Sequence, residues 1–132
     1  MILLDTHVAI WAITGTLFGR RSMSIVKKAL DEGDAAVSAI SFWEMAILIA
    51  KRRLHSAKSA ADQRAKILAA GIGEISLGGD ICILAGELEN LHADPADRLI
   101  AATAIAHDAT LMTADERLLR WRYVLRRQNA EI

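Results

Sequence analysis

Cysteine, proline and aromatic residues are scarce in this chain of 132 residues, and each shortage narrows the class of protein. The single cysteine, Cys82, excludes an internal disulfide and a cysteine-based zinc site. One proline and 8 glycines exclude collagen-like and linker-rich architectures. With 53% hydrophobic and 24% charged residues the chain is predicted to fold, and its length leaves room for one compact domain spanning residues 1–132.

Long apolar runs and an excess of one charge are missing as well. The longest stretch without Asp, Glu, Lys or Arg, Thr6 to Gly19, has 14 residues, whereas a helix that spans a bilayer needs about 20. The first basic residue is Arg20, so the basic opening of a secretory signal peptide is not expected. Because 16 basic residues balance 16 acidic ones, bulk attraction to nucleic acid is not predicted. We therefore expect a cytoplasmic protein that does not associate with membranes.

Short apolar runs alternate with helical patterns along the chain. The apolar runs predict strands over residues 1–4, 35–39, 74–77, 110–113 and 123–125. Apolar spacing and end signals predict helices over residues 7–13, 20–33, 41–54, 60–70, 80–91, 94–106 and 115–121. Thr6 is predicted to cap the first helix, and Ser41 with Glu44 has the spacing of a capping box. Alternation of this kind is typical of an α/β protein with three layers, in which helices cover both faces of a parallel sheet of four to five strands.

Acidic residues follow the predicted strands or lie in the first turns of the helices that come next. The four in question are Asp5, Glu44, Asp97 and Asp115. A parallel sheet brings these positions to one edge, where ligands bind in such folds. Helix capping and the helix dipole also favour acids in first turns, and Asp94 stands at capping distance from Asp97. Capping explains each acid separately, but it does not explain why all four fall at the same end.

Clustered carboxylates raise one another's pKa, and a divalent cation removes that repulsion. Oxygen ligands without a cysteine or a histidine pair suit Mg²⁺ or Mn²⁺ rather than zinc. The chemistry that such a cluster favours is phosphoryl transfer or phosphodiester hydrolysis by a metal-activated water.

Four stretches that contain these acids resemble the PIN-domain family, in particular the VapC-type toxin ribonucleases of bacterial toxin–antitoxin pairs. The stretches are residues 3–7 (LLDTH), 38–44 (SAISFWE), 94–104 (DPADRLIAATA) and 111–118 (LMTADERL). They occur in the order of the family and cover the chain from about residue 2 to about residue 120. The resemblance implies a five-stranded parallel sheet between helices, a Mg²⁺- or Mn²⁺-dependent endoribonuclease that acts on RNA, a homodimer, and an antitoxin protein that blocks the site.

The resemblance also implies roles for single residues. Asp5, Glu44 and Asp97 would be the core metal ligands, and Asp115 would be a fourth acid of the site. Supporting positions would be held by Thr113, through hydrogen bonding, and by Thr6 and Asp94. The family often has Asn where this chain has His7, and a neutral imidazole can replace part of that hydrogen bonding. The tail after Trp121 matches the family poorly.

Other side chains have more than one interpretation. His55, His92 and His107 are predicted to lie at helix ends and to have no functional role. The basic clusters at 51–53 and 117–127 fit solvated helix ends or a path for an RNA backbone equally well. The helices that bear Trp11 and Trp43 are predicted to flank the site and to hold an antitoxin arm that places an Arg or Lys at the acids.

Three other classes of protein share part of this pattern. A haloacid-dehalogenase-like phosphatase needs a second Asp two residues after the first, where this chain has His7. A receiver domain needs a distal Lys, and the last lysine here is Lys66. The strongest alternative is a catalytically silent PIN-like protein that holds a basic peptide in its acidic pocket.

Overall fold

A five-stranded parallel sheet forms the centre of the molecule, as the computed structural model shows for residues 1–16, 18–55 and 58–132. The strand order is β3-β2-β1-β4-β5, and each strand runs parallel to its neighbours. The strands are β1 (Ile2–Leu4), β2 (Ala35–Ser38), β3 (Gly73–Ile75), β4 (Thr110–Thr113) and β5 (Arg127–Asn129). The predicted parallel sheet is confirmed at its upper limit of five strands.

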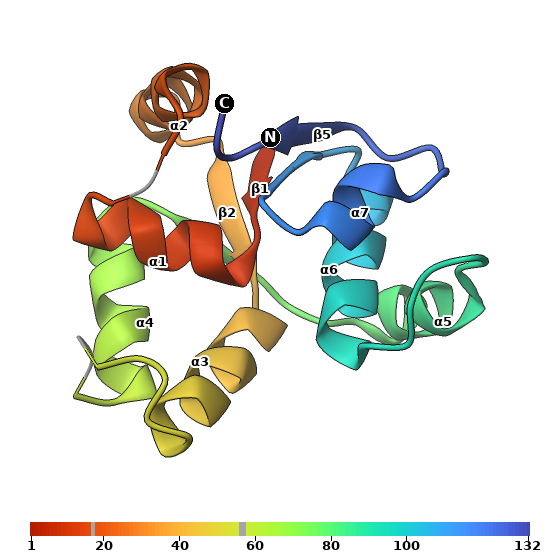
Figure 1. Cartoon of the computed structure of the whole chain (residues 1–132), viewed down its shortest axis with the longest axis horizontal. Coiled ribbons are helices and arrows are strands. Elements are labelled where there is room, and N and C mark those ends of the chain that lie inside the picture. Colours follow the sequence, from red (N-terminus) through yellow and green to blue (C-terminus); the bar gives the residue numbers. More distant parts are fainter. Residues whose placement is uncertain (17, 56–57) are drawn as a thin grey trace.

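Helices cover both faces of this sheet. They are α1 (Thr6–Thr14), α2 (Arg20–Asp31), α3 (Ile40–Ala50), α4 (Ala60–Ala69), α5 (Gly79–Glu87), α6 (Pro95–Ala106) and α7 (Glu116–Arg120). In Figure 1, α1 and α4 lie on one side of the strands and α5, α6 and α7 lie on the other. Within the described ranges, every helix is too short or too polar to cross a bilayer.

The strands separate two hydrophobic cores because successive side chains point to opposite faces of the sheet. Leu3 and Leu111 are buried with residues of α5, α6 and α7. Their neighbours Leu4 and Met112 are buried with residues of α1, α2, α3 and α4. Strands that are buried on both faces need continuous apolar runs, which explains why the sequence shows runs rather than alternation.

Two predicted helix caps are wrong. Asp5, not Thr6, is the N-cap of α1, and its Oδ1 accepts a hydrogen bond from the backbone nitrogen of Thr6 at 2.8 Å. Helix α3 begins at Ile40 with Ala39 at its N-cap, so Ser41 and Glu44 do not form a capping box. The Ala39 nitrogen donates to the Ile75 oxygen of β3 at 2.9 Å, so α3 begins directly where the hydrogen bonding to β3 ends.

The last strand and two helix ends also differ from the prediction. Strand β5 is Arg127–Asn129 rather than residues 123–125, because it is residues 127–129 that pair with Leu111–Thr113 of β4. Tyr123 instead stacks on Trp121, with ring centroids 4.6 Å apart. Helix α3 ends at Ala50 and α5 ends at Glu87, each about four residues before its predicted end. The other predicted elements agree with the structure to within two residues at each end.

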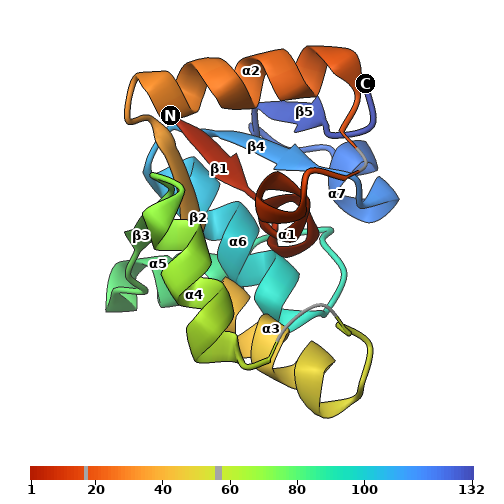
Figure 2. The same cartoon turned by 90° about the vertical axis from the view of Figure 1, so that its left-hand side faces the viewer.

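The C-terminal segment packs against α2. The backbone nitrogens of Gly19 and Arg21 donate to the oxygens of Ala130 and Ile132, at 2.8 and 2.9 Å. Figure 2 shows α2 lying along β5 at one end of the molecule. The tail after Trp121, which matches the family poorly in sequence, therefore completes the sheet and holds α2.

Candidate active site

A pocket of about 510 Å³ lies at the edge of the sheet where β1 and β4 end. The predicted acids line it together with two arginines, a histidine and an alanine; the full lining is Asp5, His7, Glu44, Arg53, Asp94, Asp97, Ala114, Asp115 and Arg117. Each acid comes from a different element. Asp5 and Asp115 lie at the junctions that begin α1 and α7, Asp97 lies in the first turn of α6, and Glu44 lies in the second turn of α3. The structure thus brings the four predicted acids into one pocket.

Asp5 is a buried acid, with 8% of its surface exposed. Its Oδ2 accepts a hydrogen bond of 2.6 Å from the Thr113 hydroxyl, and its Oδ1 accepts the bond from the Thr6 nitrogen. Burial raises the pKa of Asp5 in spite of these bonds, and the negative charge of Asp97 adds to the rise. These bonds therefore hold the Asp5 carboxyl group in place, but they supply no positive charge to balance its negative charge.

Glu44 reaches the pocket from α3 and is held by α1. The Thr6 hydroxyl donates to its Oε1, and the same hydroxyl lies 2.9 Å from the Ser41 hydroxyl. Burial raises the pKa of Glu44 to about 7, and the charges of Asp5 and Asp97 contribute to the rise. Thr6 therefore lies at the site as predicted, through its hydroxyl as well as its backbone nitrogen.

One oxygen of Asp97 contacts two side chains, those of His92 and Arg117. Its Oδ2 lies 2.6 Å from His92 Nε2 and 3.3 Å from Arg117 Nη2. Burial raises the pKa of Asp97, the bond to His92 lowers it, and the charges of Asp94 and Asp115 raise it further. Asp94 itself caps α6, as predicted, by accepting from the Asp97 nitrogen at 3.2 Å.

Asp115 differs from the other three acids because its pKa is lowered rather than raised. Burial pushes the pKa of Asp115 upward, but hydrogen bonds and the charge of Arg117 outweigh burial and leave that pKa below its usual value. Arg117 Nη2 lies 3.1 Å from Asp115 Oδ2. The Asp115 backbone nitrogen donates to the Thr113 hydroxyl at 3.0 Å, so Thr113 connects Asp115 with Asp5.

Two residues of the site, His92 and Arg117, were not identified from the sequence. The sequence predicts no functional role for His92, but its side chain is only 19% exposed and contacts Asp97. Its loop is held by Arg98, whose guanidinium donates to the carbonyl oxygens of Ala85 and Leu91 at 2.9 Å. Arg117 was grouped with the C-terminal basic cluster. Arg117 lies two residues after Asp115, in the first turn of α7. This position is the signal in the sequence that could have indicated a contact with the acids.

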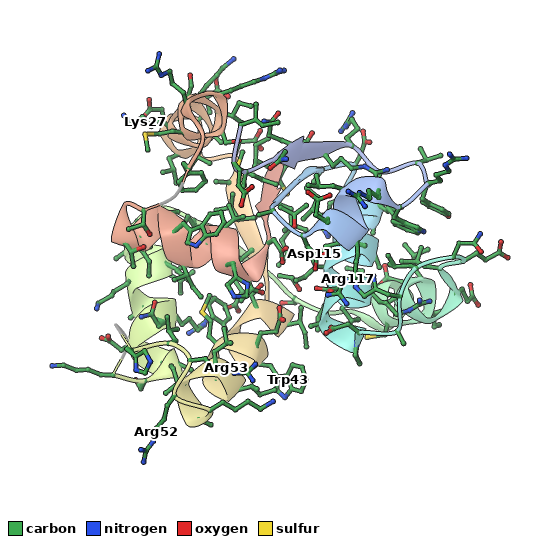
Figure 3. The ribbon with its side chains drawn as sticks, in the orientation of Figure 1. Lys27, Trp43, Arg52, Arg53, Asp115 and Arg117 are labelled. Carbon is green, nitrogen blue, oxygen red and sulfur yellow. The ribbon has the colours of Figure 1, made fainter. Side chains whose placement is uncertain are left out.

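Trp43 lies beside the acids, whereas Trp11 lies in a different groove. Trp43 is 52% exposed and lines a hollow that also contains Glu44 and Arg53. Figure 3 shows Trp43 and Arg53 beside each other, below Asp115 and Arg117 in that view. Trp11 instead packs edge-on against Phe18, at 6.2 Å between ring centroids, in a groove between α1 and α2. The surface next to the acids is therefore provided by α3 rather than by Trp11.

Comparison with known proteins decides the family. The model of the PIN domain matches residues 2–122. The chain belongs to the PIN-domain family. Over 124 residues it is 34% identical to Ribonuclease VapC22 of Mycobacterium tuberculosis (strain ATCC 25618 / H37Rv), a match that covers 92% of each chain.

Solved structures share the fold of this PIN domain. A chain of VapBC2 from Rickettsia felis, solved bound to a promoter DNA fragment, is 25% identical with a TM-score of 0.68, and 98% of each chain is covered. A chain of DNA-bound VapBC from Salmonella typhimurium has 16% identity and a TM-score of 0.69 over 96% of each chain. VapBC-1 from nontypeable Haemophilus influenzae has 21% identity and a TM-score of 0.62 over 98% of each chain.

The donor set of this PIN domain fits a hard divalent cation. Its acids offer carboxylate oxygens, and three of the four carboxyl groups have a raised pKa that a bound cation would reverse. His92, Asp97 and Asp115 each offer one ligand atom, and these atoms lie within 4.8 Å of one another. The imidazole adds a nitrogen donor, which suits Mn²⁺ better than Mg²⁺.

Proposed function

We propose that this PIN domain is a metal-dependent endoribonuclease and the toxin of a type II toxin–antitoxin pair. The observation that carries the proposal is the convergence of Asp5, Glu44, Asp97 and Asp115 in one pocket. Such an arrangement is costly for folding unless a cation compensates the charge, so a role in binding explains it better than capping does. The relative with 34% identity is named a ribonuclease, which agrees with this chemistry.

Mg²⁺ or Mn²⁺ would be held by Asp5, Glu44 and Asp97, with Asp115 beside them. When bound, the ion supplies an activated water and neutralises charge on the phosphodiester. The hydroxyls of Thr113 and Thr6 orient Asp5 and Glu44 toward the pocket. Because burial raises the pKa of Glu44 to about 7 in the metal-free protein, its carboxyl group holds a proton more readily than an exposed glutamate does. It must release that proton before its carboxylate can bind a cation.

The surface beside the acids fits a protein partner with a basic arm. Relatives of this fold were solved as VapBC or toxin–antitoxin complexes. We propose a cognate antitoxin whose arm packs along the exposed face of Trp43 and places an Arg or Lys among the acids. A peptide of that arm should inhibit cleavage less at high Mg²⁺ than at low Mg²⁺. Equal inhibition by the peptide with its basic residue changed to Ala would show that the arm covers the groove without entering the metal site.

The alternative of a catalytically silent protein that only holds a basic peptide is not favoured. Such a protein would not need all four acids, and this chain retains them within a pocket of about 510 Å³. Its similarity to a ribonuclease extends over 92% of the chain, and the match to the PIN domain over residues 2–122 includes all four acids.

Cleavage of RNA by the purified chain tests the proposal directly. The expected result is cleavage with Mg²⁺ or Mn²⁺ and none with a chelator. Asp5→Asn should lose activity under the same conditions, whereas Asp31→Asn, at an exposed position at the end of α2, should retain it. Cleavage that survives both the chelator and Asp5→Asn would contradict the proposal.

A further inference from the structure

Arg117 occupies the side of the acidic pocket where the proposed metal ligand Asp97 meets the neighbouring acid Asp115. Its Nη2 lies 3.3 Å from Asp97 Oδ2 and 3.1 Å from Asp115 Oδ2, and its Nε lies 3.3 Å from Asp115 Oδ1. The guanidinium therefore bridges two carboxylates with a single positive charge. A divalent cation bound by the same oxygens would compete with it, because both need the same negative charge.

The guanidinium is free to leave these carboxylates without disturbing the fold. The Arg117 side chain is 59% exposed, and ion pairs at such exposure are weak. The backbone of α7 is held independently, because Leu118 is buried and the Asp115 side chain accepts from the Arg117 nitrogen at 2.8 Å. His92 differs from Arg117 here, since it is mostly buried and the loop that carries it is fixed by Arg98.

A displaced Arg117 side chain would stay at the wall of the pocket, because its helix stays in place. An RNA phosphate must approach four carboxylates there, and unpaired positive charge at the wall would offset their repulsion. A guanidinium is well suited to this task because it donates two parallel hydrogen bonds to a phosphate. Arg53 lines the same pocket from the segment after α3, and Figure 3 shows it apart from Arg117.

We propose that Arg117 is a phosphate-binding residue that pairs with Asp97 and Asp115 in the metal-free protein and transfers to the RNA phosphate when the metal binds. This inference rests on the proposed ribonuclease function and adds a residue and an order of events to it. It assigns the guanidinium two roles with opposite consequences. Arg117 competes with metal in the free protein, and it promotes the reaction in the complex with RNA.

Arg120 provides a matched control on the same helix. It is also an exposed arginine, and it pairs with Glu116, at 3.1 Å, rather than with an acid of the pocket. Changing either arginine to Gln removes one positive charge from α7. A difference between the two variants therefore reports the position of the charge and not the net charge of the protein.

The experiment compares Arg117→Gln with Arg120→Gln in two measurements. The first is Mn²⁺ binding without RNA, by calorimetry, where Arg117→Gln should bind about two- to fivefold tighter than the wild type because a competing charge is gone. The second is RNA cleavage at saturating Mn²⁺, where Arg117→Gln should lose about 10- to 100-fold in kcat/KM. Arg120→Gln should bind Mn²⁺ with an affinity within about twofold of that of the wild type. Its kcat/KM for RNA should fall only by the small amount that the loss of one positive charge from the surface causes.

Opposite changes in the two measurements are the signature of the proposal, and a purely structural role cannot produce them. Weaker Mn²⁺ binding by Arg117→Gln would overturn it, as would cleavage equal to that of the wild type. A wild-type protein that cleaves no RNA with any divalent metal would overturn the proposed function and this inference together. An active wild type with an unaffected Arg117→Gln would overturn the inference alone.

Discussion

The acids of the pocket differ in how their negative charge is compensated. Asp5 and Glu44 receive neutral hydroxyl groups from Thr113 and Thr6, which orient them but supply no positive charge. Asp115 receives the guanidinium of Arg117, and its pKa is lowered where the other acids have a raised pKa. The uncompensated charge therefore lies on the side of the pocket formed by α1 and α3.

Glu44 should make the stability of the metal-free protein depend on pH. Its pKa is raised from 4.5 to about 7, so the folded state binds this proton more tightly than the unfolded chain does. The resulting stabilisation is complete below about pH 4.5 and is lost as the pH rises through about 7. We expect a loss of about 1–2 kcal/mol from this group, less than the full shift because the carboxyl is partly solvated.

Urea unfolding in chelator at pH 5 and pH 8 measures this effect. Glu44→Gln should reduce the difference in unfolding free energy between the two pH values. Glu87→Gln, at an exposed position at the end of α5, should leave the difference as it is in the wild type. Equal pH dependence in the wild type and in Glu44→Gln would show that Glu44 is not destabilised by its surroundings.

Asp5 should be needed for activity but not for stability. Asp5→Asn should lower the rate of cleavage by at least about 100-fold, as removal of a group that supports transition-state charge does in other enzymes. The asparagine can still cap α1 and contact Thr113, and it removes a buried charge. Its melting temperature in chelator should therefore equal or exceed that of the wild type. A clear drop in melting temperature would mean that Asp5 is a structural residue.

The strand-end acids could be predicted from the sequence, and the residues that pair with them could not. Asp5 directly follows β1, and Asp115 lies two residues after the end of β4. The positions of these two strands in the sheet therefore determine where the two acids lie. His92 reaches Asp97 only because Arg98 binds carbonyl oxygens along the loop between α5 and α6. Contacts of this kind depend on the path of a loop, for which the sequence carries no periodic signal.

At the scale of elements, three helices begin at the pocket with an acid at the N-cap. Asp5, Asp94 and Asp115 cap α1, α6 and α7, and each accepts a hydrogen bond from a backbone nitrogen in the first turn. The positive ends of these helices partly offset the charge of the carboxylates that gather there. The meeting of three helix N-termini at the pocket thus explains both why acids cap these helices and why the acids cluster.

Asp94 should act on α6 through its cap and not through its charge. Asp94→Ala should cost about 1 kcal/mol of stability, because the Asp97 nitrogen loses its acceptor. Asp94→Asn keeps an acceptor at the same position and should stay within a few tenths of a kcal/mol of the wild type. Urea unfolding of both variants decides the matter, and equal losses in the two would mean that the carboxylate charge itself stabilises the helix.

Local signals predicted α6 well and α3 poorly. Asp94 and Pro95 begin α6 as their own conformational preferences require, and this prediction is confirmed. The Ser41–Glu44 spacing has an equally clear local meaning, but both side chains interact with Thr6 on α1 instead. Strand β5 was misplaced for a related reason, since it pairs with β4 through partly buried polar residues that have no apolar pattern.

At the scale of the whole molecule, α3 and α5 each present a large apolar side chain that is more than half exposed to solvent. Trp43 on α3 is 52% exposed and Ile83 on α5 is 63% exposed. We predict that these helices contribute to a two-fold homodimer that brings two acidic pockets to a shared groove. Light scattering at micromolar concentration should give twice the chain mass of 14.4 kDa. The variant with Trp43→Asp and Ile83→Asp should give the mass of one chain, and a monomeric wild type would contradict the prediction.

The central claim is that Asp5, Glu44 and Asp97 form one binding site for a divalent cation. Calorimetric titration of Mn²⁺ into the metal-free protein tests it most directly, because it needs neither RNA nor an antitoxin. The wild type should bind with protons released near neutral pH, and Asp5→Asn, Glu44→Gln and Asp97→Asn should each weaken binding by at least about tenfold while remaining folded. Asp31→Asn should bind as the wild type does. Unchanged Mn²⁺ affinity in all three pocket variants would contradict the account.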